Sequence, residues 1–165
     1  MNLHTTDIND FEAVATIAKE LPTNERELFT AQTGASFDVE EFLVTLAEIV
    51  GDAPHQYTFW AGEKPVAVGG FLPQRPGVFR TWFMAPEWAW AEHGSDLTER
   101  CRAIIQELFA AGLAHRIETV TLAHREEARA WYERIGLTFE ALHPGYGANG
   151  EDAVTYVAVR KVETH

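Results

Sequence analysis

The sequence predicts a mixed α/β protein whose sheet contains both antiparallel and parallel strands. A hairpin of β-forming residues in the segment 56–71 requires antiparallel neighbours. A long amphipathic helix pattern lies between two strand-like runs, 78–84 and 117–122. This β-α-β order requires parallel neighbours that are joined by a right-handed crossover. A sheet that holds both arrangements is a mixed sheet.

Two helices are predicted in the first third of the chain, after a short first strand. Asp7 and Asp10 supply capping oxygens, and apolar residues then recur near the helical period until Pro22 ends the segment. A loop that contains glycine and threonine is expected to follow. Asp38 can cap the second helix, whose apolar face ends at Gly51.

Three strands and a long helix are predicted next. Two β-rich runs within the segment 56–71 flank a turn, and a third run at 78–84 is stopped by Pro86. Apolar residues at helical spacing then mark the long helix, and Asp96 and Glu99 are spaced as a capping box. The long helix is therefore predicted to start at Asp96.

A strand, a short helix and two further strands are predicted in the last third of the chain. The short helix follows the strand at 117–122 and ends at Gly136, which can adopt the left-handed conformation. One apolar stripe at helical spacing marks it: Ala128, Trp131, Tyr132 and Ile135. The last strands are expected at 138–142 and 153–159, separated by a glycine-rich turn.

Composition limits the class of protein. The 165 residues are 46% hydrophobic, which suits a single domain over 1–165 with a sizeable core. The net charge of −12 would repel a phosphate backbone, so nucleic-acid binding is not expected. No signal peptide or membrane-spanning run is present, so a cytoplasmic protein that does not enter a membrane is expected. The histidines and the lone Cys101 show no metal-ligand spacing, and no metal is expected.

The predicted short helix resembles the last conserved motif of the GNAT acetyltransferases. In that motif an Asn is followed by Ala after three residues, Tyr after four more, and Gly-Phe after another four. Ala128, Tyr132 and Gly136 match this spacing, whereas Arg125 holds the Asn position and Leu137 the Phe position. The predicted order of elements resembles the GNAT fold over nearly the whole chain. The resemblance implies an acetyl-CoA-dependent N-acetyltransferase that transfers an acetyl group to an amine.

The resemblance also implies where acetyl-CoA would bind. The pantetheine arm would lie between the strand before the long helix and the strand after it, and the pyrophosphate would bind backbone amides at the start of that helix, 92–97. Family members carry closely spaced glycines there, whereas this chain has Gly94 alone, flanked by acids. The implied cofactor-binding residues are Phe83, Met84, Ala85, His93, Gly94, Ser95, Asp96, Arg125 and Ala128.

Acyl transfer to an amine requires a base that accepts a proton from the amine and an acid that protonates the leaving thiolate. Tyr132 is the implied acid because of its motif position, although an apolar stripe at this spacing is also typical of a helix that only packs. The predicted base is His124 at the carboxyl end of a strand, with His93 and Glu87 as second choices.

The acceptor is expected to be a small-molecule or peptide amine. Residues 1–70 hold 3 basic and 12 acidic side chains, and an acidic rim would attract a cationic amine. The other interpretation of these acids is a solvated surface that serves solubility. The expected rim consists of Glu25, Glu27, Asp38, Glu40 and Glu41.

A closer resemblance points to a different function. The run 81–90, followed by Gly94, Ile135, Gly136 and Phe139, resembles a small GNAT-like family of short-tailed bacteriophages that includes internal virion proteins. This resemblance implies the alternative of a catalytically inactive virion or interaction protein, located in the host-cell cytoplasm or in the virion. Whether the protein is a homodimer is left open.

Overall fold

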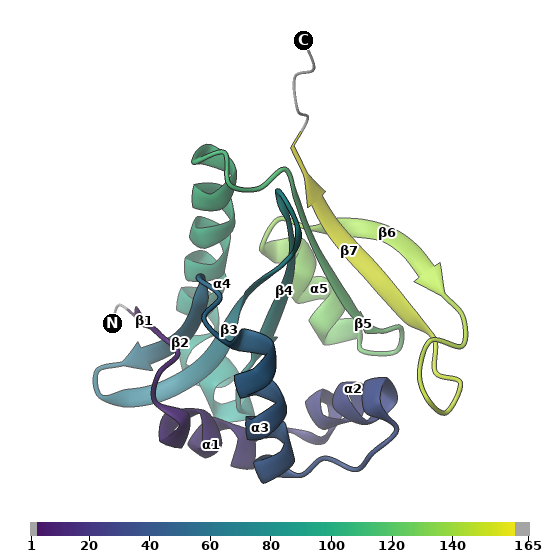
Figure 1. Cartoon of the computed structure of the whole chain (residues 1–165), viewed down its shortest axis with the longest axis horizontal. Coiled ribbons are helices and arrows are strands. Elements are labelled where there is room, and N and C mark those ends of the chain that lie inside the picture. Colours follow the sequence, from purple (N-terminus) through teal and green to yellow (C-terminus); the bar gives the residue numbers. More distant parts are fainter. Residues whose placement is uncertain (1–2, 161–165) are drawn as a thin grey trace.

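The computed structural model describes residues 3–160 and contains a seven-stranded sheet with helices on both faces (Figure 1). In chain order the elements are β1 (His4–Asp7), α1 (Phe11–Lys19), α2 (Thr23–Thr33), α3 (Val39–Val50), β2 (Gln56–Ala61), β3 (Lys64–Arg75), β4 (Val78–Met84), α4 (Glu87–Ala110), β5 (Arg116–Leu122), α5 (Glu126–Arg134), β6 (Thr138–His143) and β7 (Ala153–Val159). The strand order is β1-β2-β3-β4-β5-β7-β6. The β4–β5 pair is parallel and the other pairs are antiparallel, so the predicted mixed α/β fold is confirmed.

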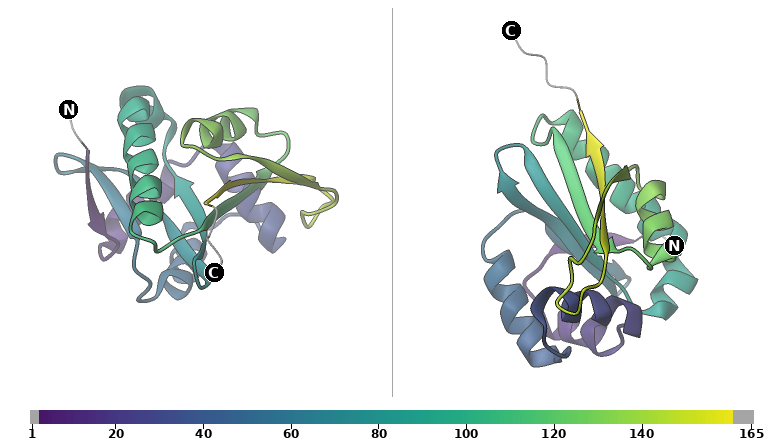
Figure 2. Two further views of the ribbon diagram at one scale, coloured as in Figure 1. Left: turned by 90° about the horizontal axis from the view of Figure 1, so that it is seen from above. Right: turned by 90° about the vertical axis from the view of Figure 1, so that its right-hand side faces the viewer.

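Buried apolar residues of the described chain form two clusters, one on each face of the sheet. Figure 2 shows the helices that cover the two faces. On one face α4 and α5 pack against the sheet through residues such as Leu97, Ile104 and Trp131. On the other face α1 and α3 bury Ile17 and Leu46. Each of these four helices therefore presents one apolar stripe to the sheet, as the sequence pattern predicts. Among residues 3–160, no helix combines the length and the apolar character needed to cross a membrane.

The segment that the sequence analysis placed in a loop forms a helix, α2. Only Glu25 and Ala31 of this helix are buried, so no apolar stripe marks it in the sequence. Pro22 precedes the helix, and Gly34 ends it in the left-handed conformation with φ 76°. The prediction of a loop was wrong because this helix is held by its surroundings and not by an amphipathic pattern. The helix α2 matters for the site because it places the side chain of Glu25 in the interior.

The long helix starts nine residues earlier than predicted, at Glu87 directly after Pro86. Asp96 therefore lies inside the helix and does not cap its start. Proline is tolerated at the start of a helix because it has no backbone N–H to lose there. Past the first turn, each backbone N–H of α4 is bonded to a carbonyl four residues earlier. The predicted set of free amides at 92–97 is thus absent, and the pyrophosphate site expected on them is not formed.

β4 and β5 are paired only at their beginnings and then separate. The paired residues are Val78–Arg80 with Arg116–Glu118, and beyond them Thr119 Oγ1 donates to the Thr81 carbonyl at 3.0 Å. From Phe83 onward the two strands are no longer bonded to each other. The two strands therefore splay apart, as the resemblance implied. The sheet is open at this point, so that its two faces are connected there.

A tight contact between β2 and β3 involves Gly70. A Cβ atom at residue 70 would lie 2.1 Å from Gln56 Oε1. The Gln56 side chain is buried and held in place, because it donates to the Phe71 carbonyl at 2.7 Å and accepts from Trp82 Nε1 at 2.8 Å. Glycine at this position therefore allows a buried side-chain network to form.

We expect the substitution Gly70→Ala to lower the free energy of unfolding by about 1 to 3 kcal/mol, because the added methyl group would displace Gln56. Chemical denaturation would measure the change. Gly94→Ala is the matched control, since a Cβ at residue 94 meets no atom within 4 Å and alanine favours a helix over glycine. A Gly70→Ala protein as stable as the wild type would contradict this interpretation.

Candidate active site

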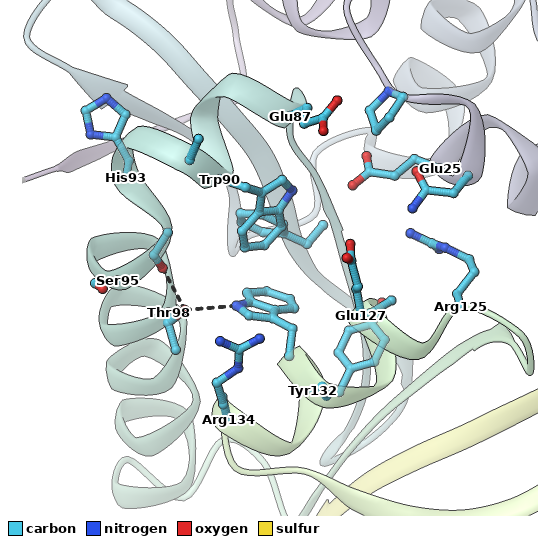
Figure 3. Close-up of a pocket in the computed structure, with 18 of the residues that line it drawn as sticks. Glu25, Glu87, Trp90, His93, Ser95, Thr98, Arg125, Glu127, Tyr132 and Arg134 are labelled. Carbon is cyan, nitrogen blue, oxygen red and sulfur yellow. Dashed lines mark hydrogen bonds between the residues drawn. The ribbon is translucent and has the colours of Figure 1, made fainter.

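Two cavities meet at the splay between β4 and β5. The larger, which we call the cleft, has a volume of about 1110 Å³ and lies between α4, α5 and the start of α2 (Figure 3). The smaller, which we call the apolar pocket, has a volume of about 280 Å³ and lies between α2, α3 and the splayed strands. Four residues line both cavities and form what we call the junction: Glu25, Phe83, Arg125 and Tyr132.

Glu25 is a buried carboxylate at the junction. It is only 9% exposed, and its Oε2 accepts a hydrogen bond from the backbone N–H of Ala85 at 3.3 Å. Burial raises the pKa of Glu25 from 4.5 to about 7, although Arg125, the Ala85 amide and the Trp90 indole each act in the opposite direction. A carboxylate with a pKa near 7 can accept and release a proton at neutral pH.

Tyr132 is the second proton-carrying group at the junction, and α5 holds it 7% exposed. Burial raises its pKa above the ordinary value, with Arg125 and the Thr119 hydroxyl acting against the shift and Glu25 adding to it. The phenol is therefore protonated at neutral pH and available as a hydrogen-bond or proton donor. Tyr132, the residue that the motif spacing singled out, thus lies where the two cavities meet.

Arg125 supplies the positive charge at the junction. Its guanidinium lies at the same end of the cleft as the Glu25 carboxylate (Figure 3). Nη1 donates to Thr121 Oγ1 at 3.1 Å, whereas Nε is buried and has no hydrogen-bond partner among residues 3–160. The guanidinium can therefore favour negative charge on either Glu25 or Tyr132.

Aromatic rings form the wall of the cleft beside the junction. The ring centroid of Trp131 lies 4.8 Å from that of Phe83 and 5.0 Å from that of Trp90. The Trp131 indole donates to Thr98 Oγ1 at 3.0 Å, which fixes its orientation (Figure 3). An uncharged, extended group that packs against this wall would cover the rings and shield them from water.

The charges along the cleft differ from those expected for a phosphate site. The free amides of α4 are in its first turn, where Glu87 lines the cleft, and two arginines, Arg102 and Arg134, lie further along. The cleft is also lined by several acids: Glu25, Glu87, Glu92, Asp96, Glu99 and Glu127. The splay and the aromatic wall fit an uncharged acyl-pantetheine arm. The acids disfavour phosphates, and the cleft counters them with arginine side chains rather than with a glycine-rich loop, although Arg102 also donates to the Arg134 carbonyl.

Most of the predicted cofactor-binding residues line the cleft, namely Phe83, His93, Gly94, Ser95, Asp96, Arg125 and Ala128. Met84 instead lines the apolar pocket, and the amide of Ala85 is bonded to Glu25. Gly94, Ser95 and Asp96 contribute from inside a helix, so their role cannot be the one expected of free amides.

His124, the predicted base, lies outside both cavities. Its side chain is 63% exposed, and Nε2 lies 3.1 Å from Glu27 Oε2 at the surface. The structure therefore does not bring His124 to the junction, where Tyr132 lies. The sequence analysis did not single out Glu25 as a buried acid at the junction, because a single acid in a segment without an apolar stripe shows no pattern that marks it as buried.

The expected acidic rim does not surround the apolar pocket. Of its five members only Glu25 lines the pocket. Glu27 pairs with His124, and Asp38 caps α3 by accepting from the Glu41 amide at 3.0 Å. Among the described residues, Glu27 and Asp38 therefore have local structural partners, and the five acids do not form a charged wall around the pocket.

A mixed sheet that splays between its fourth and fifth strands, with a crossover helix between them, is the fold of the GNAT acetyltransferases. Solved structures with this fold include a ribosomal L7/L12 alpha-N-protein acetyltransferase in complex with coenzyme A, which is 12% identical with a TM-score of 0.76 over 97% of this chain and 95% of that chain. The ribosomal-protein-S18-alanine N-acetyltransferase from Escherichia coli is 13% identical, with a TM-score of 0.67 over 99% and 97% of the two chains. A GNAT-family acetyltransferase from Bacillus anthracis is 13% identical, with a TM-score of 0.72 over 96% and 95%.

Comparisons of sequence add no family assignment, since no family model and no curated protein sequence matches the chain. At identities of 12–13%, the structural likeness establishes the fold alone. The function has to be inferred from the residues of the site.

Proposed function

We propose that the protein is an acetyl-CoA-dependent N-acetyltransferase that binds acetyl-CoA in the cleft and an amine in the apolar pocket. The observation that carries this proposal is that the two cavities meet at one junction, where Glu25 and Tyr132 both lie. Two substrates that enter from separate cavities would be held with their reacting atoms close together, which favours direct transfer.

In the proposed reaction Glu25 is the base and Tyr132 is the acid. Acetyl-CoA supplies an activated thioester carbonyl. As the amine nitrogen forms a bond to the acetyl carbon and the carbon–sulfur bond breaks, Glu25 accepts the proton that leaves the nitrogen. Tyr132 donates its phenolic proton to the departing thiolate, and Arg125 favours the negative charge left on the phenol.

The solved structures support this proposal because they include enzymes that acetylate protein amines and one that is bound to coenzyme A. They give no support to the alternative of a catalytically inactive virion or interaction protein. The alternative does make a different prediction, because a non-catalytic chain would neither bind acetyl-CoA nor release a thiol from it.

Acetyl-CoA is expected to raise the melting temperature of the purified protein, because a ligand that binds only the folded state stabilises it by mass action. Differential scanning fluorimetry with increasing acetyl-CoA would measure the shift. Arg134→Ala is expected to reduce it, since the cleft offers arginine side chains to the phosphates, whereas Arg75→Ala, at the end of β3 and outside both cavities, serves as the control. An unchanged melting temperature at millimolar acetyl-CoA, together with no thiol release in the presence of any amine, would contradict the proposal.

A further inference from the structure

The apolar pocket has a lining that restricts the amine it can accept. Its volume of about 280 Å³ is at the small end of ligand pockets. Its walls come from α2, α3 and the splayed strands and are mainly apolar: Leu28, Phe29, Phe42, Leu46, Ile49, Trp82, Met84 and Val120. The pocket is therefore suited to a compact apolar group.

One wall of the pocket is fixed by aromatic packing. Phe29 makes edge-to-face contacts with Phe37 and Phe42, at centroid distances of 5.5 Å and 6.3 Å. Such contacts hold each ring in one orientation, so the wall is formed before a ligand binds. A preformed apolar wall favours a ligand that also presents a ring or a branched aliphatic group.

The pocket has one carboxylate, Glu25 at its inner end. One ammonium group can pair with this carboxylate. The charged groups that also line the pocket are Arg80 and Arg125, which are positive and would repel a second ammonium. A second ammonium on a ligand that fills the pocket would have no carboxylate partner among the lining residues, which is unfavourable.

We infer that the acceptor is a primary amine with one positive charge on an apolar body, as in an arylalkylamine or the first residue of a peptide that begins with a hydrophobic amino acid. This inference rests on the proposed function, because it names the acceptor class for the same site. It narrows the expected cationic amine to one with a single charge because, of the rim acids, only Glu25 lines the pocket. The apolar body fills the pocket, and the ammonium lies at Glu25 beside Tyr132.

Turnover with a panel of amines tests the inference. The amines are 2-phenylethylamine, a tetrapeptide that begins with phenylalanine, 1,4-diaminobutane and spermidine. We expect kcat/KM for 2-phenylethylamine or for the peptide to exceed that for either polyamine by about 10-fold or more. Comparison of the two preferred amines distinguishes a free arylalkylamine from a peptide terminus. Equal or faster turnover of the polyamines would overturn the inference and leave the proposed function intact.

A matched pair of variants on α3 tests whether the apolar pocket determines the preference between amines. Ile49 lines the pocket and is 54% exposed, whereas Val44 is 60% exposed and lines neither cavity. Ile49→Glu adds a carboxylate at the pocket and is expected to reduce the preference for 2-phenylethylamine over 1,4-diaminobutane by about 10-fold. Val44→Glu makes the same chemical change on the same helix and is expected to leave the preference unchanged. Equal effects of the two variants would contradict the assignment of the pocket.

A binding measurement separates failure of the inference from failure of the proposed function. Isothermal titration of the wild type with 2-phenylethylamine and with 1,4-diaminobutane, without acetyl-CoA, reports on the pocket alone. Tighter binding of 2-phenylethylamine supports the inference about the pocket, whether or not turnover is observed. The absence of thiol release with every amine would contradict only the acetyltransferase function. Tighter binding of the diamine overturns the inference whatever the turnover.

Discussion

The substitution Glu25→Gln is expected to lower kcat/KM by about 100-fold to 1000-fold, which is the usual contribution of a positioned general base. In the wild type, kcat/KM is expected to rise with pH through about 7, as Glu25 loses its proton. Glutamine has no proton to lose, so this limb of the pH profile should be absent from the variant. Steady-state kinetics between pH 5.5 and 8.5 with one amine would measure both effects.

The same variant is expected to be more stable than the wild type at high pH. The pKa of Glu25 is raised by folding, so between pH 4.5 and about 7 the folded state holds a proton that the unfolded state has lost. The contribution of Glu25 to the free energy of unfolding therefore falls as pH rises through this range, by an amount on the order of 3 kcal/mol. The Glu25→Gln variant has no such titrating group at this position. Its free energy of unfolding should therefore exceed that of the wild type most above pH 7 and little at pH 4.5.

Glu27→Gln is the matched control for this experiment, because Glu27 is on the same helix and lines neither cavity. It is expected to leave both kcat/KM and the pH profile unchanged. If Glu25→Gln retained the wild-type pH profile, Glu25 could not be the base. Loss of activity together with loss of stability would indicate that Glu25 has only a structural role.

The substitution Tyr132→Phe is expected to lower kcat about 100-fold, because the leaving thiolate would lose its proton donor. The phenylalanine ring should keep the contacts with Trp131 and Tyr156, whose ring centroids lie 5.6 Å and 6.0 Å away. The melting temperature should therefore change little. Steady-state kinetics and a thermal melt of the same preparation would measure the two quantities.

Tyr156→Phe provides the control for the loss of a buried hydroxyl. Tyr156 belongs to the same aromatic cluster but lines neither cavity, and its hydroxyl accepts a hydrogen bond from Arg129 Nε at 3.1 Å. This variant is expected to lose about 1 kcal/mol of stability and to keep its turnover. A Tyr132→Phe enzyme with full activity and reduced stability would assign Tyr132 to the core.

The sequence by itself determined the parts of this protein that depend on local periodicity. Alternating β-forming residues predict the strands of the mixed sheet, and apolar stripes predict α1, α3 and α5. The spacing of Ala128, Tyr132 and Gly136 identified the residue that lies at the junction of the two cavities. The predictions of the helices and strands succeed because each element has to bury one face, and the required spacing is visible along the chain.

Only the tertiary structure decided which polar residues meet at the site. α2 shows no amphipathic stripe, and α4 continues through a segment that resembles a capping box, so the position of each depends on packing with distant elements. Glu25 and Tyr132 are 107 residues apart in the chain and become neighbours of the same cavities because the sheet splays between β4 and β5. Burial at that junction shifts the pKa of Glu25 to about 7, whereas His124 remains exposed beside Glu27. Burial is a property of the folded protein, and no local pattern in the sequence encodes it for a single acidic residue.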